Sequence, residues 1–274
     1  MAATTMPGAA APTLHWVERA PEPLTESHVL RALDSVIDPE LDEPITDLGF
    51  VRSVTLTGAS VEVHLRLPTS FCAPNFAYLM ASDTKDVLAA LPDVGVVTVE
   101  LDDHHDSDII NRGLAAEAGY QGTFLHEAES SLDELRATFQ RKAHTAAMER
   151  ALTAFLRTRP GIAEEAIAAV VLGDLPNDSA KAALLRRRET IGLSTVDFAT
   201  VLVDDRGSPC PAASAALALR RARSTRISID GNAHFCRGLL ATRYPDSEAD
   251  QLPRAQENFF PLSSLIRTHK RKIA

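Results

Sequence analysis

Three cysteines are the side chains of this sequence best suited to bind a soft metal ion or to act as a nucleophile, and they are Cys72, Cys210 and Cys236. So odd and sparse a set argues against a disulfide framework and predicts reduced thiols in a cytoplasmic protein. Cys72 comes just before Pro74, where a helix is expected to begin, and the positive end of a helix favours a thiolate. A thiolate there can hold iron, zinc or a cluster, or attack an electrophile; the alternative is a small buried residue.

A second group of candidate metal ligands lies in the segment DGNAHFCRGLL at 230–240, where His234 precedes Cys236 by two positions and Asp230 lies nearby. A single His-x-Cys doublet is a weak signature, because zinc sites usually pair two such doublets. If the parts of the chain fold together, we predict one thiolate-rich metal site formed by Cys72, Cys210, His234 and Cys236. The alternative is a histidine at the edge of a loop beside a packed cysteine.

The densest run of metal-capable side chains is Asp-Asp-His-His-Asp at 102–106. Imidazole and carboxylate groups together suit iron or zinc. Adjacent side chains of an extended segment point in opposite directions, however, so only part of the run could bind one ion. A solvated linker is the favoured interpretation of this segment.

The hydrophobic pattern predicts the elements that position these residues. Helical spacing and strict alternation predict an α-β-β-α-β order, with a helix at 26–37, strands at 50–56 and 61–67, a helix at 74–91 and a strand at 94–101. Helices then follow at 107–118, 131–158, 162–172, 178–189, 195–203 and 211–223, the second of them opening with a capping box at Ser131. The predicted class is α+β, a small N-terminal α-β-β-α-β domain followed by a mainly α-helical C-terminal domain.

The predicted domain boundaries follow from the same pattern and from composition. We expect a disordered leader at 1–23, the α+β domain at 24–103, the helical domain at 104–266 and a basic tail at 267–274. The leader is rich in Ala, Thr and Pro and lacks the features of a signal peptide. No apolar run approaches the roughly 20 residues that a membrane span needs, so we expect a cytoplasmic protein.

Charge is distributed unevenly over the 274 residues, whose formal net charge is −9. Residues 1–130 carry 21 acidic and 6 basic side chains, a net −15, and residues 131–274 carry 16 acidic and 22 basic, a net +6. The acidic half argues against nucleic acid as a partner, because phosphate contacts need Lys and Arg. The arginine runs at 186–188 and 220–223 either dock on an acidic partner protein or pair with the acidic half of this chain.

Several common functional signatures are absent from the sequence. It has no Glu-x-x-His pair of a di-iron bundle, no P-loop, no dinucleotide-binding glycine motif and no Gly-x-Ser-x-Gly elbow. Nor does it have the four cysteines of a conventional permanent iron–sulfur cluster.

Three motifs occur in a characteristic order: DPELDEPITDLGFV at 38–51, LPTSFCAPNF at 67–76 and GVVTVEL at 95–101. Over about residues 26–103 the chain thereby resembles the iron–sulfur cluster assembly family that contains PaaD and SufT. The resemblance implies that the recurring functional positions of the family fall here on Glu40, Asp47, Thr69 and Cys72. One departure is Ala73, which separates the cysteine from the proline that usually follows it directly.

The resemblance implies a maturation factor or metallochaperone rather than an enzyme. Such a factor delivers or inserts iron, or an iron–sulfur cluster held transiently, into a client metalloenzyme; zinc stays open as the metal. Relatives such as PaaD imply that the client is the oxygenase component of a bacterial multicomponent di-iron oxygenase, with other assembly factors and self-association as further contacts. Two alternatives remain: an enzyme with Cys72 as nucleophile and His64 or His234 as base, and a protein-interaction module without metal.

Overall fold

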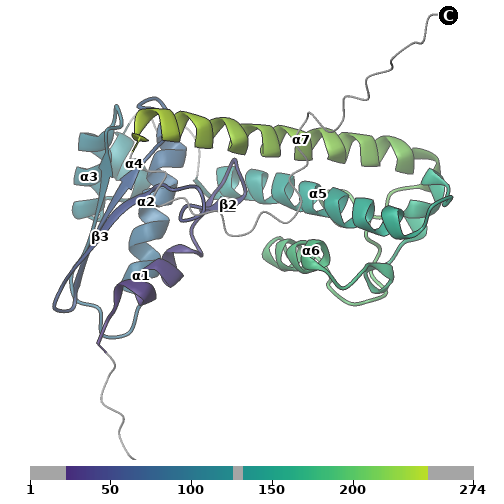
Figure 1. Cartoon of the computed structure of the whole chain (residues 1–274), viewed down its shortest axis with the longest axis horizontal. Helices are drawn as coiled ribbons and strands as arrows, with labels where there is room; N and C mark the ends of the chain where they lie inside the picture. The colour runs from purple at the N-terminus through teal and green to yellow at the C-terminus, as the bar shows by residue number, and fades with distance from the viewer. Residues whose placement is uncertain (1–22, 126–131, 246–274) are drawn as a thin grey trace, which may run out of the picture.

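The N-terminal region is an α+β unit, and mainly helical structure follows it, as the sequence predicts (Figure 1). The structure, a computed structural model, describes residues 23–125 and 132–245. The predicted leader at 1–23 therefore lies almost wholly outside the described residues, and the basic tail at 267–274 and Ser131 of the predicted capping box lie wholly outside them. The N-terminal elements are α1 (Glu26–Leu33), β1 (Ile37–Asp38), β2 (Glu43–Pro44), β3 (Val51–Thr57), β4 (Ser60–Arg66), α2 (Pro74–Ala89) and β5 (Val97–Asp102).

The central sheet has the strand order β3-β4-β5. β3 and β4 form the predicted antiparallel hairpin, and β5 joins β4 in parallel after the crossover through α2. Alternation along β4 buries Val61, Val63 and Leu65 in the core. Glu62 and His64 consequently project from the opposite face of the sheet.

The first helix ends earlier than the predicted 26–37. Thr25 caps its start by accepting a hydrogen bond from the His28 N–H, and α1 stops at Leu33. The prediction is wrong for the last four residues because Ile37 instead pairs with Pro44 in the small β1–β2 ladder. The connection at 38–49 is therefore a compact hairpin whose apolar side chains join the core, and these are Leu41, Ile45 and Leu48.

The helical region contains α3 (Ser107–Ala115), α4 (Gly119–Phe124), α5 (Leu132–Thr158), the short 3-10 helices η2 (Glu164–Ala169) and η3 (Leu172–Asp174), α6 (Ser179–Thr190) and α7 (Ala212–Arg243). Two predictions are wrong here. The segment 195–203 is not helical, since Thr200 and Val203 form isolated β-bridges and β-branched residues are frequent in it. The helix predicted at 211–223 is 32 residues long in all and ends only at Arg243, so the segment 230–240 is helical.

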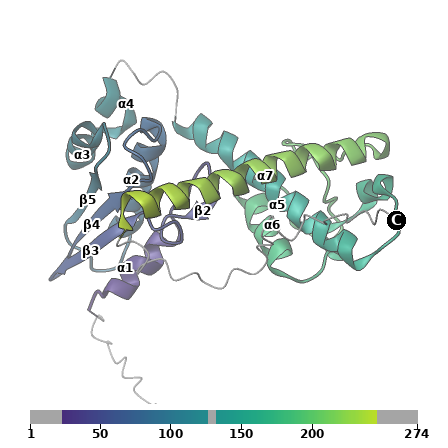
Figure 2. The same cartoon turned by 45° about the horizontal axis from the view of Figure 1, so that its top comes forward.

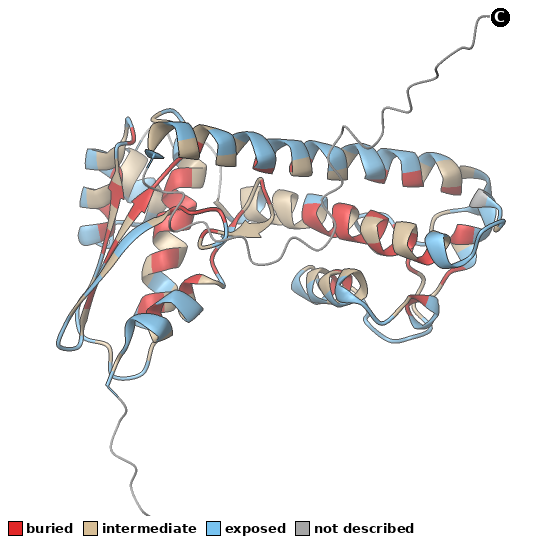
Figure 3. Ribbon diagram, in the orientation of Figure 1, coloured by how far each residue is buried: buried red, intermediate tan, exposed pale blue. Residues whose placement is uncertain are grey.

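Buried residues form two core clusters, and α7 contributes to both. Figures 1 and 2 show this helix running beside α5 and onward across the N-terminal unit, and Figure 3 shows its buried residues along one side. Ala215, Leu219 and Ala222 belong to the helical core, whereas Ala233 and Leu240 belong to the core of the α+β unit. A domain boundary after residue 103 remains a prediction, because α7 is shared between the two cores. No helix among residues 23–125 and 132–245 has the length and apolar character of a membrane span.

One buried group of the helical core predicts acid sensitivity. His144 on α5 is 1% exposed and its Nε2 has no hydrogen-bond partner. Burial, together with the charges of Arg188 and Arg187, lowers the pKa of His144 from 6.5 to about 4. The unfolded chain therefore binds more protons between pH 6.5 and pH 4, and stability falls as the pH is lowered through that window, by up to about 3 kcal/mol for this group.

We expect His144→Leu to remove this contribution. Denaturant unfolding at pH 7 and pH 4.5 should show a smaller loss of stability for the variant than for the wild type. Equal losses in the two proteins would show that His144 does not titrate in this range.

Candidate functional site

The acidic hairpin after α1 is built around Asp38, which is buried although the loop composition favours solvated carboxylates. Asp38 is 6% exposed, and its Oδ1 accepts the N–H groups of Glu40 and Leu41, both at 2.8 Å. Burial raises the pKa of Asp38 from 3.8 to about 6, even though these two hydrogen bonds act to lower it. The backbone of Glu40 is thereby held at the turn, whereas Asp47 is exposed further along.

The loop that carries Cys72 connects β4 to α2 and is fixed from one side by the segment after β5. Cys72 is half-buried and precedes Ala73, the N-cap of α2. His104 accepts the Asp106 N–H at Nδ1 (3.1 Å), so its Nε2 carries the hydrogen that it donates to the Cys72 carbonyl (2.8 Å). Thr69 Oγ1 accepts the Phe71 N–H (3.2 Å) and lies 3.5 Å from Cys72 Sγ, which leaves the hydroxyl hydrogen free to point at the sulfur.

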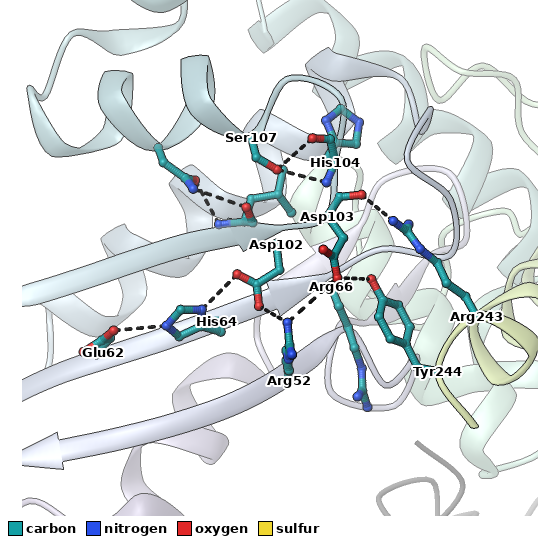
Figure 4. Close-up of polar contacts among 12 residues, drawn as sticks. Arg52, Glu62, His64, Arg66, Asp102, Asp103, His104, Ser107, Arg243 and Tyr244 are labelled. Carbon is teal, nitrogen blue, oxygen red and sulfur yellow. Dashed lines mark hydrogen bonds and ion pairs between the residues drawn. The ribbon is translucent and has the colours of Figure 1, made fainter. Parts of the chain in front are cut away.

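The end of α7 fixes the same loop from a second side. Arg243 donates to the Leu67 carbonyl at 3.1 Å, to Ser70 Oγ at 2.8 Å and to the Asp103 carbonyl. Tyr244 donates to Asp103 Oδ2 at 3.0 Å, and Figure 4 shows these side chains meeting at the end of the sheet. The position of the Cys72 loop therefore depends on a helix more than 130 residues further along the chain.

Earlier turns of α7 contact the acidic hairpin. Asn232 Nδ2 donates to Glu40 Oε1 at 3.1 Å, and Arg237 forms an ion pair with Glu43. The same helix thus touches both motifs that the sequence singles out, the hairpin at 38–49 and the loop at 67–73.

Cys236 lies on α7 between Asn232, which contacts the acidic hairpin, and Arg243, which contacts the Cys72 loop. It is half-buried and packs, like Cys72, against the core of the α+β unit. Burial raises the pKa of the Cys236 thiol to about 11, and the carboxylates of Asp38 and Glu40 add to the shift. Cys72 and Cys236, which are 164 positions apart in the sequence, thus pack against one and the same core.

The outer face of the sheet carries a separate polar row, shown in Figure 4. His64 bonds Asp102 through Nδ1 (2.9 Å) and Glu62 through Nε2 (3.0 Å), and Asp102 also accepts from Arg52 at 2.7 Å. The hydrogen bond that His64 makes to Asp102 raises the pKa of His64, burial opposes this, and the weaker effect of the hydrogen bond to Glu62 adds to the rise. Both ring nitrogens are engaged by carboxylates, so His64 is poorly suited to act as a base for Cys72.

Cys210 packs against a different core from Cys72, and the remaining predicted ligand, His234, is exposed. Cys210 packs against the helical core, with its sulfur 3.4 Å from Ser214 Oγ. His234 is exposed on α7, and residues two apart on a helix do not face each other, so its ring points away from Cys236. Asp230 is bound by Arg150 at 2.5 Å and Arg226 at 2.6 Å. Within the described ranges no group of three or more His, Cys, Asp or Glu side chains has the arrangement of a metal site.

The segment at 102–106 is not a solvated linker throughout. His104 is buried at 7% exposure and holds the Cys72 carbonyl, so the sequence-based interpretation is wrong for this residue. Its role is to position the loop rather than to bind an ion.

The arginine run at 186–188 is largely used within the molecule. Arg187 pairs with Asp42 of the acidic hairpin at 2.6 Å, and Arg188 is buried and donates to the carbonyls of Ser194 and Thr200. Arg186 alone of the three is exposed. The sequence allowed two roles for these arginines, docking on a partner protein or pairing with the acidic half of the same chain. Arg187 has the second role.

Three residues of this site were not identified from the sequence: Asp38 as a buried carboxylate, His104 as the anchor of the loop, and Arg243 as its clamp. The Asp-Pro dipeptide after a helix is a signal that could have marked Asp38 as a turn-forming side chain. Nothing in the sequence near Arg243 indicates its contacts, because they depend on how α7 packs.

Residues 26–101 match the family model described as iron-sulfur cluster assembly protein. This segment is a domain of that family, with its α+β elements in the predicted order. The same region is 38% identical over 78 residues to an iron-sulfur cluster carrier protein from Mycobacterium leprae (strain TN). The alignment covers 28% of this chain and only 20% of that relative, so the likeness concerns one domain of each.

Proposed function

We propose that this protein carries iron, alone or in an iron–sulfur cluster, and delivers it to a client metalloenzyme, with Cys72 as the thiol that binds this cargo. The observation that carries the proposal is the way Cys72 is presented. The half-buried Cys72 stands before the first turn of α2, on a loop held by His104 and Arg243, within a segment that matches the cluster assembly family.

The chemistry of this arrangement suits a soft metal. Thiolate sulfur is a preferred ligand of iron and iron–sulfur clusters, and the positive end of a helix stabilises negative charge beside it. The Thr69 hydroxyl can donate to the sulfur at 3.5 Å. A loop fixed by hydrogen bonds to backbone carbonyls keeps the thiol in one position whether or not the cargo is bound.

We further propose that the client is the oxygenase component of a bacterial multicomponent di-iron oxygenase and that delivery takes place in the cytoplasm. Support for the client comes from the resemblance of the Cys72 and acidic motifs to PaaD-like proteins. Of the two arginine runs, the exposed Arg186 and Arg221 are available to an acidic partner surface.

The host strain tests this client directly. We expect the oxygenase purified from a strain that lacks this gene to be poor in iron, and iron content to be restored by the wild-type gene and by Cys210→Ser, but not by Cys72→Ser. Iron analysis of the purified oxygenase is the measurement. An oxygenase with full iron content in the deletion strain would exclude it as the client.

A further inference from the structure

The buried side of α7 brings a second thiol, that of Cys236, against the domain that carries Cys72. Ala233 and Leu240 on this side are part of the α+β core, and Cys236 follows the first by three positions and precedes the second by four. Residues spaced by three and four positions share one face of a helix. Cys236 therefore faces the domain that carries Cys72, unlike the exposed His234.

Polar contacts on both sides of Cys236 fix this part of α7. One turn earlier Asn232 donates to Glu40 at 3.1 Å, and seven residues later Arg243 donates to Leu67 and Ser70 of the Cys72 loop. The helix is thus held at the acidic hairpin and at the Cys72 loop, with the Cys236 thiol between them.

We propose that Cys236 supplies a second thiolate to the iron atom that Cys72 binds. This inference rests on the proposed function and names a ligand that lies outside the family domain at residues 26–101. On binding, the ferrous ion forms one bond to each sulfur and the two thiol protons pass to solvent, without any change in oxidation state.

Two thiolates give the bound iron an incomplete ligand set. Iron–sulfur sites are usually held by four cysteine ligands. With two positions left to exchangeable ligands, the thiols of a client can enter before those of the carrier leave. The arrangement therefore suits temporary holding and transfer better than permanent storage.

A spectroscopic titration with Co²⁺ as the probe tests the assignment, since thiolate–Co²⁺ bonds give a charge-transfer band whose intensity rises with the number of thiolates. Wild type and the matched control Cys210→Ala should bind with the same band. Cys236→Ala, which keeps an apolar side chain, should lose about half of the band and bind about tenfold or more weakly. Circular dichroism melts identify any variant that fails to fold.

The outcomes separate this inference from the proposed function. A Cys236→Ala variant with the wild-type band and affinity, alongside a Cys72→Ala variant that binds nothing, would overturn the role of Cys236 and leave that of Cys72 intact. A wild-type protein without any thiolate–Co²⁺ band would overturn both.

A trivalent arsenical provides a second, metal-free readout. Phenylarsine oxide condenses with two neighbouring thiols, forming two As–S bonds and releasing one water. We expect one stable adduct on wild type and on Cys210→Ala by mass spectrometry, and none on Cys72→Ala or Cys236→Ala. No adduct on wild type would show that the two thiols are not neighbours, and an adduct that persists in Cys236→Ala would show that Cys236 takes no part in it; either result would contradict the inference.

Discussion

Glu149→Gln should lower the unfolding free energy of the protein by about 2 to 3 kcal/mol, because the carboxylate is buried between two arginines and would lose its charge and one of its two acceptor oxygens. Glu149 on α5 is 1% exposed and binds Arg226 at 2.5 Å and Arg223 at 3.0 Å, both on α7. Burial alone would raise the pKa of Glu149, but the hydrogen bonds from Arg223 and Thr153 and the charge of Arg226 outweigh it and lower the pKa. The contribution is therefore present at neutral pH and is lost as the pH falls through this lowered pKa.

The arginines of this network are partly exposed, at 47% for Arg223 and 26% for Arg226, so the cost is smaller than for a fully buried pair. We expect the melting temperature to fall by about 5 to 10 °C at pH 7. Glu189→Gln, which changes an exposed glutamate on α6 in the same way, is the matched control and should melt like wild type. If Glu149→Gln also melts like wild type, the ion pairs do not hold α5 against α7.

This network bears on function because it fixes the middle of α7. Asp230 extends it by pairing with Arg150 and Arg226, and the cargo-site contacts of the helix begin two residues later at Asn232. Loosening the pairing of α5 with α7 should therefore also weaken the clamp on the Cys72 loop.

The α+β unit could be predicted well from the sequence because its signals are local. Alternation marks β3 and β4, and Pro74 marks the start of α2 within a residue or two. The position of Cys72 before that helix followed from the same signals. The burial of Asp38 could not be predicted from local signals. It depends on the hairpin formed by β1 and β2, in which Ile37 pairs with Pro44, and composition does not reveal this pairing.

The sequence pattern predicts this helix only to residue 223, and two glycines lie in the part of α7 that follows. Gly231 and Gly238 are exposed and a Cβ at either position would meet no atom within 4 Å, so the helix tolerates each at a cost of about 1 kcal/mol. The packing of α7 across both cores offsets that cost. The placement of Cys236 against the core of the α+β unit is a consequence of this packing, which depends on contacts between residues far apart in the sequence.

Cys72→Ser should abolish the binding of iron, since it removes the thiol on which the proposed function depends. Cys72 is half-buried and its carbonyl, rather than its side chain, holds the loop through His104. We therefore expect the variant to keep the wild-type fold and melting temperature, with the effect confined to the cargo. Cys210→Ser, the same change at a half-buried thiol of the helical core, is the control.

The most direct measurement is the iron and sulfide content of the full chain after anaerobic incubation with Fe²⁺ and sulfide and removal of unbound ions. The proposed function predicts that wild type and Cys210→Ser retain iron and show thiolate-to-iron absorption in the visible range, whereas Cys72→Ser retains neither. Equal iron content in Cys72→Ser and wild type, or no retained iron in wild type, would contradict it.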